Sequence, residues 1–405
     1  MTATSTLVDR INQRIEELEP QMIEQRRDFH MYPELGFEEE RTSRIVENHL
    51  RSLEGMVVRR CARTGLVAVL NPEKAGPTVL LRADMDALPV QEENEVEYRS
   101  RVDGVMHACA HDAHTAMLMT AATILSELRE EIPGKVKFVF QPNEEVGGAE
   151  DMVEEGVLDD PAVDAAFAIH LWTPLPSGVI GVKAGGVMAT MDVFRITVTG
   201  LGGHTGYPDS AIDPIITAAE IIQSAQTIQT REINLMKPTA IMFAKIQGGT
   251  KNNIIPGSVE LEGSMRYLYD GGPGSPENPG QRLERIVRGL CEAHRNQYEL
   301  EIERENTAVI NDPAMAQVAH WAALATLGGD QAKVVEHASM AGEDFAAFAS
   351  RVPSCFYFIG TGNPEKRSDY PHHNARFNID EDTMRTGVEM HLRTVFEYFE
   401  FRKRR

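Results

Sequence analysis

The chain has 405 residues, of which 42% are hydrophobic and 25% charged, and its formal net charge is −21. This composition is typical of globular proteins and excludes disorder over the whole chain, and the length predicts two or three domains. The excess of acidic residues argues against nucleic acid or an anionic membrane as a partner, because both attract basic surfaces.

The cysteines show no CxxC spacing, so we expect neither a disulfide framework nor a zinc ribbon; they are Cys61, Cys109, Cys291 and Cys355. The polar, helix-like beginning of the chain lacks the apolar core of a signal peptide. No apolar run approaches the roughly 18 residues that a membrane-spanning helix requires. We therefore expect a cytoplasmic protein.

The first 188 residues predict alternating helices and strands. This alternation favours an α/β sheet with helices on both faces. Pro20 either splits the first helix or begins a second one. The expected helices cover 6–28, 38–54 and 112–129, and the expected strands cover 66–70, 78–82, 135–140 and 165–169.

From about residue 190 the pattern changes to half-exposed strands. A strand through Phe194, Ile196 and Val198 is followed by a helix at 211–229, strands at 239–247 and 257–268, a helix at 280–297 and a strand near 300–302. This β-α-β-β-α-β order is ferredoxin-like. We therefore expect an inserted α+β domain at 189–306 between the two parts of another domain, 1–188 and 307–405, which ends with a strand at 354–360 and a helix at 380–402.

Potential metal ligands follow several of the expected strands. Ligands of open α/β sheets bind beyond the carboxyl ends of the strands, so side chains at these points converge. The residues concerned are Asp84 and Asp86, Glu144 and Glu145, His170, and, after a loop, His372 and His373.

The segment MHACAHDAHTAML is the densest group of such residues. It contains His107, Cys109, His111, Asp112 and His114 directly before a helix. Any single histidine here has a packing or capping role as its ordinary alternative. The combination of thiolate, imidazole and carboxylate, however, predicts a site for zinc, manganese or a similar divalent ion.

The adjacent pair Glu144 and Glu145 predicts a division of labour. Neighbouring side chains of an extended loop diverge, so one carboxylate can bind metal while the other faces the substrate. A carboxylate that is not a ligand is then placed to act as general base and later to protonate the leaving amine. The alternative is a solvated acidic pair.

Three residues of the inserted domain are candidates for substrate contact. His204 lies in the glycine-rich segment GLGGHTGYP, where it could stabilise an oxyanion, and its alternative is an ordinary turn histidine. Asn253 lies in GGTKNNIIPG. Arg266 could grip a carboxylate with two hydrogen bonds, and its alternative is a surface salt bridge.

These motifs together resemble one family. Along the chain stand RRDFHMYPELGFEE, LRADMDALPV, MHACAHDAHTAML, QPNEEVGGAEDMVEEGVL, GLGGHTGYP, NNIIPG, MAGEDF and HHNARF. From about residue 26 to about residue 395 the sequence resembles the aminoacylase-like metallopeptidases. Within them it is most similar to the branch of hippurate hydrolases, N-acyl-L-amino-acid amidohydrolases and auxin-conjugate hydrolases.

The resemblance implies a metallopeptidase-type catalytic domain with a central mixed sheet and an inserted lid domain. It implies two divalent ions per chain, zinc or manganese, with cobalt and nickel as further candidates. The implied reaction is hydrolysis of the amide of an N-acyl amino acid by a metal-activated water. It also implies a homodimer formed through the lid, and in some relatives the lid histidine acts across the dimer interface.

The resemblance also assigns roles to single residues. As catalytic residues it implies the general base Glu144, the lid histidine His204 and Asp86, which with Asp84 would orient the site. The implied substrate-binding residues are Asn253, Arg266 and Gly342 of MAGEDF. The implied metal ligands are Cys109, His111, Glu145, His170 and His373, with His372 as the alternative to the last.

The sequence departs from the family pattern at several positions, none of which removes a ligand. Where relatives read CGHDGH, this chain has Ala110 and Ala113, and an alanine would strain the loop at either position if the backbone has a positive φ. Ala341 lies next to the expected substrate pocket and affects the expected acyl specificity. The remaining departures are Asp209 and Ala375.

Three other functions fit part of the pattern. A dipeptidase or a specialised deacetylase would use the same site. A cysteine amidase would use Cys109 as nucleophile but would leave the carboxylates at the strand ends without a role. A non-catalytic small-molecule or metal-binding protein would not need the base Glu144.

Overall fold

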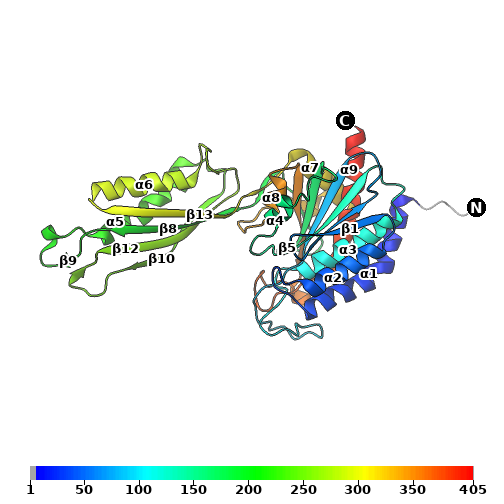
Figure 1. The fold of residues 1–405 in the computed structure, drawn as a ribbon, viewed down its shortest axis with the longest axis horizontal. Helices are drawn as coiled ribbons and strands as arrows, with labels where there is room; N and C mark the ends of the chain where they lie inside the picture. The colour runs from blue at the N-terminus through cyan, green and yellow to red at the C-terminus, as the bar shows by residue number, and fades with distance from the viewer. Residues whose placement is uncertain (1–5, 405) are drawn as a thin grey trace, which may run out of the picture. The chain divides into compact units, whose positions relative to one another are not determined.

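The computed structural model describes residues 6–404 and divides into two compact units (Figure 1). The first unit comprises Met1–Val187, Ile310–Ala338 and Asp344–Arg405, and the second comprises Met188–Val309 and Ser339–Glu343. The observed divisions lie within a few residues of the boundaries expected at 188 and 306. The short return of the chain to the second unit at Ser339–Glu343 has no counterpart in the sequence prediction.

The first unit contains an eight-stranded sheet in the order β1-β2-β4-β3-β5-β16-β6-β15. Its four central strands, β4, β3, β5 and β16, run parallel, so their carboxyl ends meet at one edge. The pairs β1–β2 and β2–β4 are antiparallel, which confirms the expected mixed sheet. The strands are β1 (Met56–Cys61), β2 (Gly65–Leu70), β3 (Thr78–Asp84), β4 (Lys135–Gln141), β5 (Ala165–Pro176), β6 (Ile180–Gly181), β15 (Val334–Val335) and β16 (Ser354–Gly362).

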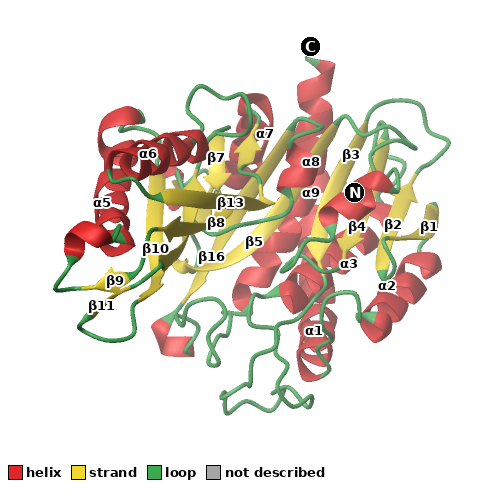
Figure 2. Ribbon diagram, turned by 60° about the vertical axis from the view of Figure 1, so that its left-hand side comes forward, coloured by secondary structure: helices red, strands yellow, loops and turns green. Residues whose placement is uncertain are grey.

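Helices cover this sheet and close the main hydrophobic core (Figure 2). Strands β2 and β3 are buried along their whole length; β2 is apolar throughout, whereas β3 carries the buried charges Arg82 and Asp84 toward its carboxyl end. Helices α1, α3 and α9 pack against one another, and α7 packs against α9. The helices are α1 (Leu7–Met31), α2 (Glu40–Ser52), α3 (His111–Glu127), α4 (Ala149–Glu154), α7 (Pro313–Thr326), α8 (Ala346–Ala349) and α9 (Asp382–Lys403), with 3₁₀ turns at Gln331–Lys333 and Pro364–Lys366.

Helix α1 continues through Pro20, so the expected break at this residue is wrong. Pro20 is exposed, and the carbonyl that loses its helical hydrogen bond therefore faces water. The buried side chains of Ile15 and Met22 hold the helix to the core on both sides of the proline. None of the described helices is both long enough and apolar enough to cross a membrane.

The second unit contains an antiparallel sheet in the order β10-β12-β8-β13 with its own hydrophobic core. The chain order β8-α5-β10-β12-α6-β13 is the β-α-β-β-α-β arrangement that the sequence predicts. The elements are β8 (Thr190–Thr199), α5 (Pro214–Thr227), a π-helical turn (Ile228–Glu232), β10 (Thr239–Gly248), β12 (Ser258–Tyr267), α6 (Pro279–Ala293) and β13 (Gln297–Asn306). Shorter elements are β7 (Gly185–Met188), which pairs with β14 (Val309–Asn311), β9 (Gly203–His204), which pairs with β11 (Ile254–Ile255), and a 3₁₀ turn at Pro208–Ser210.

Candidate metal centre

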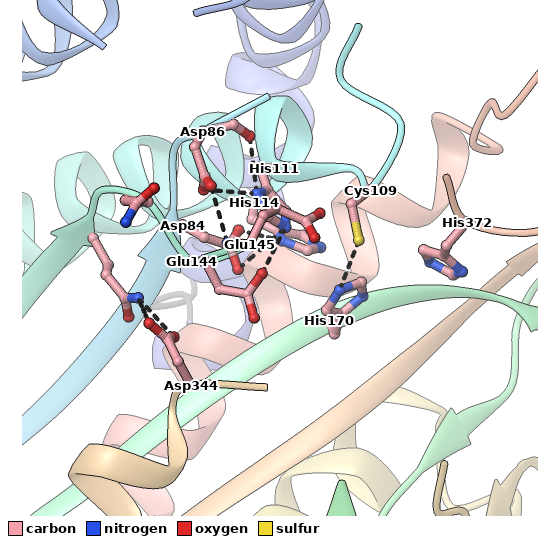
Figure 3. Close-up of polar contacts among 12 residues, drawn as sticks. Asp84, Asp86, Cys109, His111, His114, Glu144, Glu145, His170, Asp344 and His372 are labelled. Atoms are coloured by element: carbon pink, nitrogen blue, oxygen red, sulfur yellow. Dashed lines mark hydrogen bonds and ion pairs between the residues drawn. The ribbon is translucent and has the colours of Figure 1, made fainter. Parts of the chain in front are cut away.

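Two groups of possible metal ligands lie beyond the carboxyl ends of the parallel strands (Figure 3). One group is Cys109, His111 and Glu145, and the other is Cys109, His170 and His372. In each group the possible ligand atoms all lie within 4.8 Å of one another. Cys109 belongs to both groups, so its sulfur would be available to an ion held by either group.

The backbone at Ala110 brings Cys109 and His111 together. Ala110 has φ 68° and is the N-cap of α3, so the chain turns sharply between the two ligands. This is the left-handed region, in which glycine is favoured over alanine. Ala113 lies inside α3 and has no positive φ. Of the two departures from CGHDGH, only Ala110 therefore carries the expected strain.

His111 is held in one orientation by Asp86. Its Nδ1 lies 2.9 Å from the backbone oxygen and 3.1 Å from the Oδ1 of Asp86, so this nitrogen donates the hydrogen bond. In the neutral imidazole, the lone pair of Nε2 then remains available for a metal ion. Nε2 of His111 and Oε1 of Glu145 are buried and have no hydrogen-bond partner among the described residues. Both atoms have ion-pair contacts, at 3.3 Å from His373 to Glu145 and at 3.7 Å from Asp84 to His111, but no hydrogen bond satisfies them, and this fits a divalent cation.

The electrostatics of His111 also fit a cation. Burial by itself lowers the pKa of this imidazole, but the nearby carboxylates of Asp84, Asp86 and Glu145 outweigh burial and raise the pKa to about 10. The surrounding negative charge therefore favours a positive charge at this point of the site. A bound metal ion would supply that charge.

The second group contains neutral imidazoles. His170 places Nε2 at 3.5 Å from Sγ of Cys109, while its Nδ1 donates to the backbone oxygen of Leu171 at 2.8 Å. Burial holds the pKa of His170 well below its usual range, and burial lowers the pKa of His372 to about 3. Neutral imidazole is the form that binds metal ions.

The structure places His372, and not His373, in the group with Cys109 and His170. His372 stacks on Trp172, with ring centroids 4.4 Å apart, and its Nε2 lies 3.0 Å from the backbone oxygen of Leu171. His373 has φ 63° and is exposed, and its Nε2 lies 3.3 Å from Oε1 of Glu145. The left-handed backbone at His373 thus turns the two neighbouring rings in different directions, and the expected ligand His373, with His372 as its alternative, stays a prediction.

Glu144 lies beside both groups without belonging to either. Its Oε2 is 3.8 Å from Nε2 of His111, and the side chain is half-buried. The adjacent Glu145 is a member of the first group, and the division of labour between the two glutamates stays a prediction.

A buried charged network lies beneath the ligands. The carboxylate of Asp84 accepts hydrogen bonds from Nη1 of Arg82 and Nδ1 of His114, each at 2.7 Å. Burial opposes the charge of Asp84, but His111, His114 and Arg82 outweigh it and hold the pKa of this carboxyl well below its usual range. Asp84 is therefore an anion, and it contacts the rings of His111 and His114.

His114 supports the site without being available as a ligand. Its Nε2 accepts a hydrogen bond from the backbone N–H of Leu171 at 2.9 Å, and its Nδ1 is bound to Asp84. A role for His114 could not be assigned from the sequence, where it is one of several candidates in MHACAHDAHTAML. The signal was the spacing of three residues from His111, which puts both side chains on one face of α3.

The candidates in the second unit form two separate pairs. His204 in β9 and Asn253 are both exposed, and the backbone oxygen of Asn253 accepts from Thr205 N at 3.3 Å. Arg266 stands near the opposite end of β12, and its Nη1 donates to the backbone oxygen of Met340 at 2.8 Å. The rise of an antiparallel strand separates the two pairs by roughly 25 Å or more.

Gly342 lies in the same segment as Met340, whose backbone oxygen accepts the hydrogen bond of Arg266. A Cβ atom built on Gly342 would lie 2.8 Å from Oδ1 of Asn306, so no side chain fits at this position without movement. The neighbouring Ala341 accepts a backbone hydrogen bond from Ala189 N at 2.8 Å. The part of MAGEDF up to Glu343 is thus fixed within the second unit.

The chain belongs to the peptidase family M20/M25/M40, whose pattern it matches over residues 80–397. It is thereby a metal-dependent hydrolase. It is 36% identical over 391 residues to thermostable carboxypeptidase 1 of Saccharolobus solfataricus, covering 95% of this chain and 97% of the relative. It is 40% identical over 305 residues to an N-acyl-L-amino acid amidohydrolase of Geobacillus stearothermophilus, covering 75% and 81%.

A solved structure shows the same fold. The YXEP protein of Bacillus subtilis, described as a dinuclear metal-binding peptidase of the M20 family, has a TM-score of 0.81 and 31% sequence identity. The likeness covers 95% of this chain and 99% of that protein.

Proposed function

We propose that this protein hydrolyses the amide bond of N-acyl amino acids and releases a carboxylic acid and a free amino acid. The observation that carries this proposal is the pair of ligand groups that share Cys109, with the carboxylate of Glu144 3.8 Å from the ring of His111 and in neither group. The relative named N-acyl-L-amino acid amidohydrolase supports the same substrate class. The four cysteines are buried thiols that form no disulfide among the described residues, which supports a cytoplasmic location, where thiols stay reduced.

The site residues then have distinct roles. Cys109, His111, Glu145, His170 and a histidine of the pair His372–His373 would hold two divalent ions, zinc or manganese, which supply Lewis-acid activation of the nucleophilic water and of the amide carbonyl. Glu144 accepts the proton of the nucleophile and then gives it to the leaving amine. Asp86 keeps His111 in the tautomer that offers Nε2.

The last ligand is assigned to His372, because its ring lies in the group with Cys109 and His170. Its counterpart His373 instead approaches Glu145 from the exposed side. His372→Ala and His373→Ala variants compare the two neighbours directly. Loss of one metal equivalent on elemental analysis in His373→Ala, with full occupancy in His372→Ala, would reverse the assignment.

The substrate class is tested by the release of free amino acid from acetyl, benzoyl and indole-acetyl amino acids, with dipeptides in a parallel set. Each reaction contains added manganese or zinc and has a chelator control. Release from the conjugates that the chelator suppresses is expected. Release from dipeptides alone would favour a dipeptidase. The name of one relative, thermostable carboxypeptidase 1, supports testing this alternative. Activity that survives chelation but not thiol alkylation would point to Cys109 as nucleophile.

The role of Glu144 is tested by Glu144→Gln. The amide cannot accept the proton, so kcat should fall by at least about 10²-fold, which is the usual contribution of a general base. Elemental analysis should still find two metal ions per chain, because Glu144 is in neither ligand group with Cys109. A variant with near wild-type kcat would show that another residue is the base.

We further propose that two copies of the chain form a homodimer through the second unit. Strand β10 is an edge strand with exposed Met242 and Ile246, whereas the opposite edge β13 carries four glutamates that would repel a second copy. The separation of His204 from Arg266 within one chain also favours a dimer, because one substrate cannot reach both. His204 would then serve the site of the other copy.

Complementation between two inactive variants tests this arrangement. Glu144→Gln and His204→Ala are each expected to be inactive alone. Mixing and re-annealing them should restore activity, because a hybrid dimer contains one site with both wild-type residues. A protein that sedimentation shows to be monomeric, or a mixture without activity, would contradict the arrangement.

A further inference from the structure

The loop that carries Glu144 and Glu145 is a tight turn between β4 and α4. Asn143 has φ 52°, and its backbone oxygen accepts from Gly147 N at 2.8 Å, so the turn closes around the two glutamates. A left-handed asparagine followed by a closed turn needs support from its surroundings, because this conformation is sparsely populated. That support comes from carboxylates that are distant in sequence.

Glu39 holds the first residue of the turn. Its Oε1 accepts from the backbone N–H of Asn143 at 2.9 Å, and its Oε2 accepts from Oγ1 of Thr64 at 2.5 Å. Glu39 is fully buried. Gly36 leaves room for the same asparagine, because a Cβ atom on Gly36 would lie 2.0 Å from Oδ1 of Asn143.

Asp344 holds the other end of the turn. Its Oδ2 accepts from the backbone N–H groups of Gly148 and Ala149, each at 2.9 Å. Its carboxylate also accepts from Nε2 of Gln141, at 2.7 Å to one oxygen and 2.8 Å to the other. Between the two ends, Oδ2 of Asp86 accepts from Glu145 N at 3.1 Å.

We propose that Glu39 and Asp344 are positioning residues of the catalytic loop, and that with Asp86 they form a clamp of three carboxylates on its backbone. This inference rests on the proposed role of Glu144 as base. Hydrogen bonds that a carboxylate accepts from backbone N–H groups are charge-assisted and are among the stronger ones in proteins. The clamp fixes the main chain at residues 143, 145 and 148–149, and it thereby determines the position of the Glu144 backbone between these points.

The motif PELGFEE in the first part of the chain gains a function from this clamp. It stands far from the other motifs in sequence and contains no metal ligand. Gly36 and Glu39 of this motif both meet Asn143, the residue before the base. The motif therefore acts on the reaction through the backbone of another loop.

The test compares Glu39→Leu with two matched variants. Glu39→Gln keeps an oxygen for Asn143 N and offers an N–H to Thr64, so it should restore function. Glu34→Leu is the control: Glu34 also accepts two backbone N–H bonds, but from Arg41 and Thr42 at the start of α2. Two readouts are measured, namely hydrogen exchange of the peptide over residues 141–149 and the kinetic constants for an N-acyl amino acid.

In Glu39→Leu, exchange of the loop should become faster by about tenfold or more, since one charge-assisted bond is lost. The kcat should fall by roughly 10²-fold, as for a base displaced by about 1 Å, while KM and bound metal stay near the wild-type values. Glu39→Gln should resemble wild type in both readouts. Glu34→Leu should leave the loop exchange and kcat unchanged.

Unchanged loop exchange or unchanged kcat in Glu39→Leu would overturn the proposal, as would an equal loss of kcat in Glu34→Leu. If Glu39→Leu does not fold, Gly36→Ala tests the same point, because its new Cβ displaces Asn143 while Glu39 stays in place. Faster loop exchange in Glu39→Leu, together with an active Glu144→Gln, would retain the clamp and reject Glu144 as the base.

Discussion

His114 is a buried histidine whose two nitrogens are both used by the protein. One nitrogen binds Asp84 at the end of β3 and the other accepts from the backbone of Leu171 in β5. Leu171 directly follows the candidate ligand His170. A side chain of this kind couples two strand ends and thereby determines where a neighbouring ligand stands.

We expect His114→Leu to lower the free energy of unfolding by about 2–4 kcal/mol, because it leaves a buried carboxylate and a buried N–H with one partner fewer. His107→Leu is the matched control, since both nitrogens of His107 are buried without a hydrogen-bond partner among the described residues. Burial lowers the pKa of His107 to about 4, so this imidazole is neutral at pH 7. Urea unfolding of the metal-free proteins measures the free energy of unfolding of both variants. An equal loss in the two variants would show that the His114 hydrogen bonds contribute nothing.

The residues of the site could be predicted from the sequence to the level of the segment, but not always to the level of the side chain. Parallel strands bring their carboxyl ends together, so Asp86, Glu145 and His170 could be expected at one edge. The choice between His372 and His373 depends on a single φ of 63° in a loop, which no periodicity reveals. The clamp by Glu39 was equally hidden, because it joins residues 104 positions apart.

At the level of elements, α3 begins with a left-handed turn at Ala110, between the candidate ligands Cys109 and His111, where alanine is less favourable than glycine. Ala110 has a left-handed backbone and is fully buried, and Ala113 is equally buried in regular helix. Replacing either residue by glycine removes one buried methyl group, so the difference between the two variants isolates the backbone. This difference is a direct measure of the strain at the N-cap.

Ala113→Gly is expected to lose about 1 kcal/mol to helix propensity in addition to the methyl group. Ala110→Gly should recover roughly 1–2 kcal/mol of left-handed strain. We therefore expect Ala110→Gly to be the more stable of the two by about 2 kcal/mol or more in urea unfolding. Equal stabilities would mean that the turn at Ala110 relaxes without cost.

Long elements could be predicted from sequence and very short ones could not. The helices α3 and α9 and the strands β4 and β12 have clear patterns and were expected close to their observed bounds. Strands of two residues, such as β6 and β15, are too short to show an alternation. Strand β1 was missed as well, because Arg59 and Arg60 interrupt its apolar pattern.

At the scale of the whole molecule, the two units have separate hydrophobic cores, and only the first unit contains the two ligand groups that share Cys109. The core of the first unit contains the sheet and the helices that carry the ligand groups, and that of the second unit contains no member of the two groups that share Cys109. The stability of the two units should therefore respond differently to metal, because a ligand stabilises only the folded part that binds it.

Calorimetry of the protein with and without chelator tests this expectation. At a free metal concentration of 100 times Kd, binding stabilises the folded first unit by about 2.7 kcal/mol. Chelation should thus lower the Tm of one transition by roughly 5–10 °C and leave the other in place. Leu261→Ala identifies the second transition, because Leu261 is fully buried in the second core and its truncation costs about 2–5 kcal/mol. Leu261→Ala marks the transition of the second unit. If chelation shifts only that transition, the ligand groups of the first unit are not the metal site. If there is a single transition and both chelation and Leu261→Ala shift it, the two units unfold together.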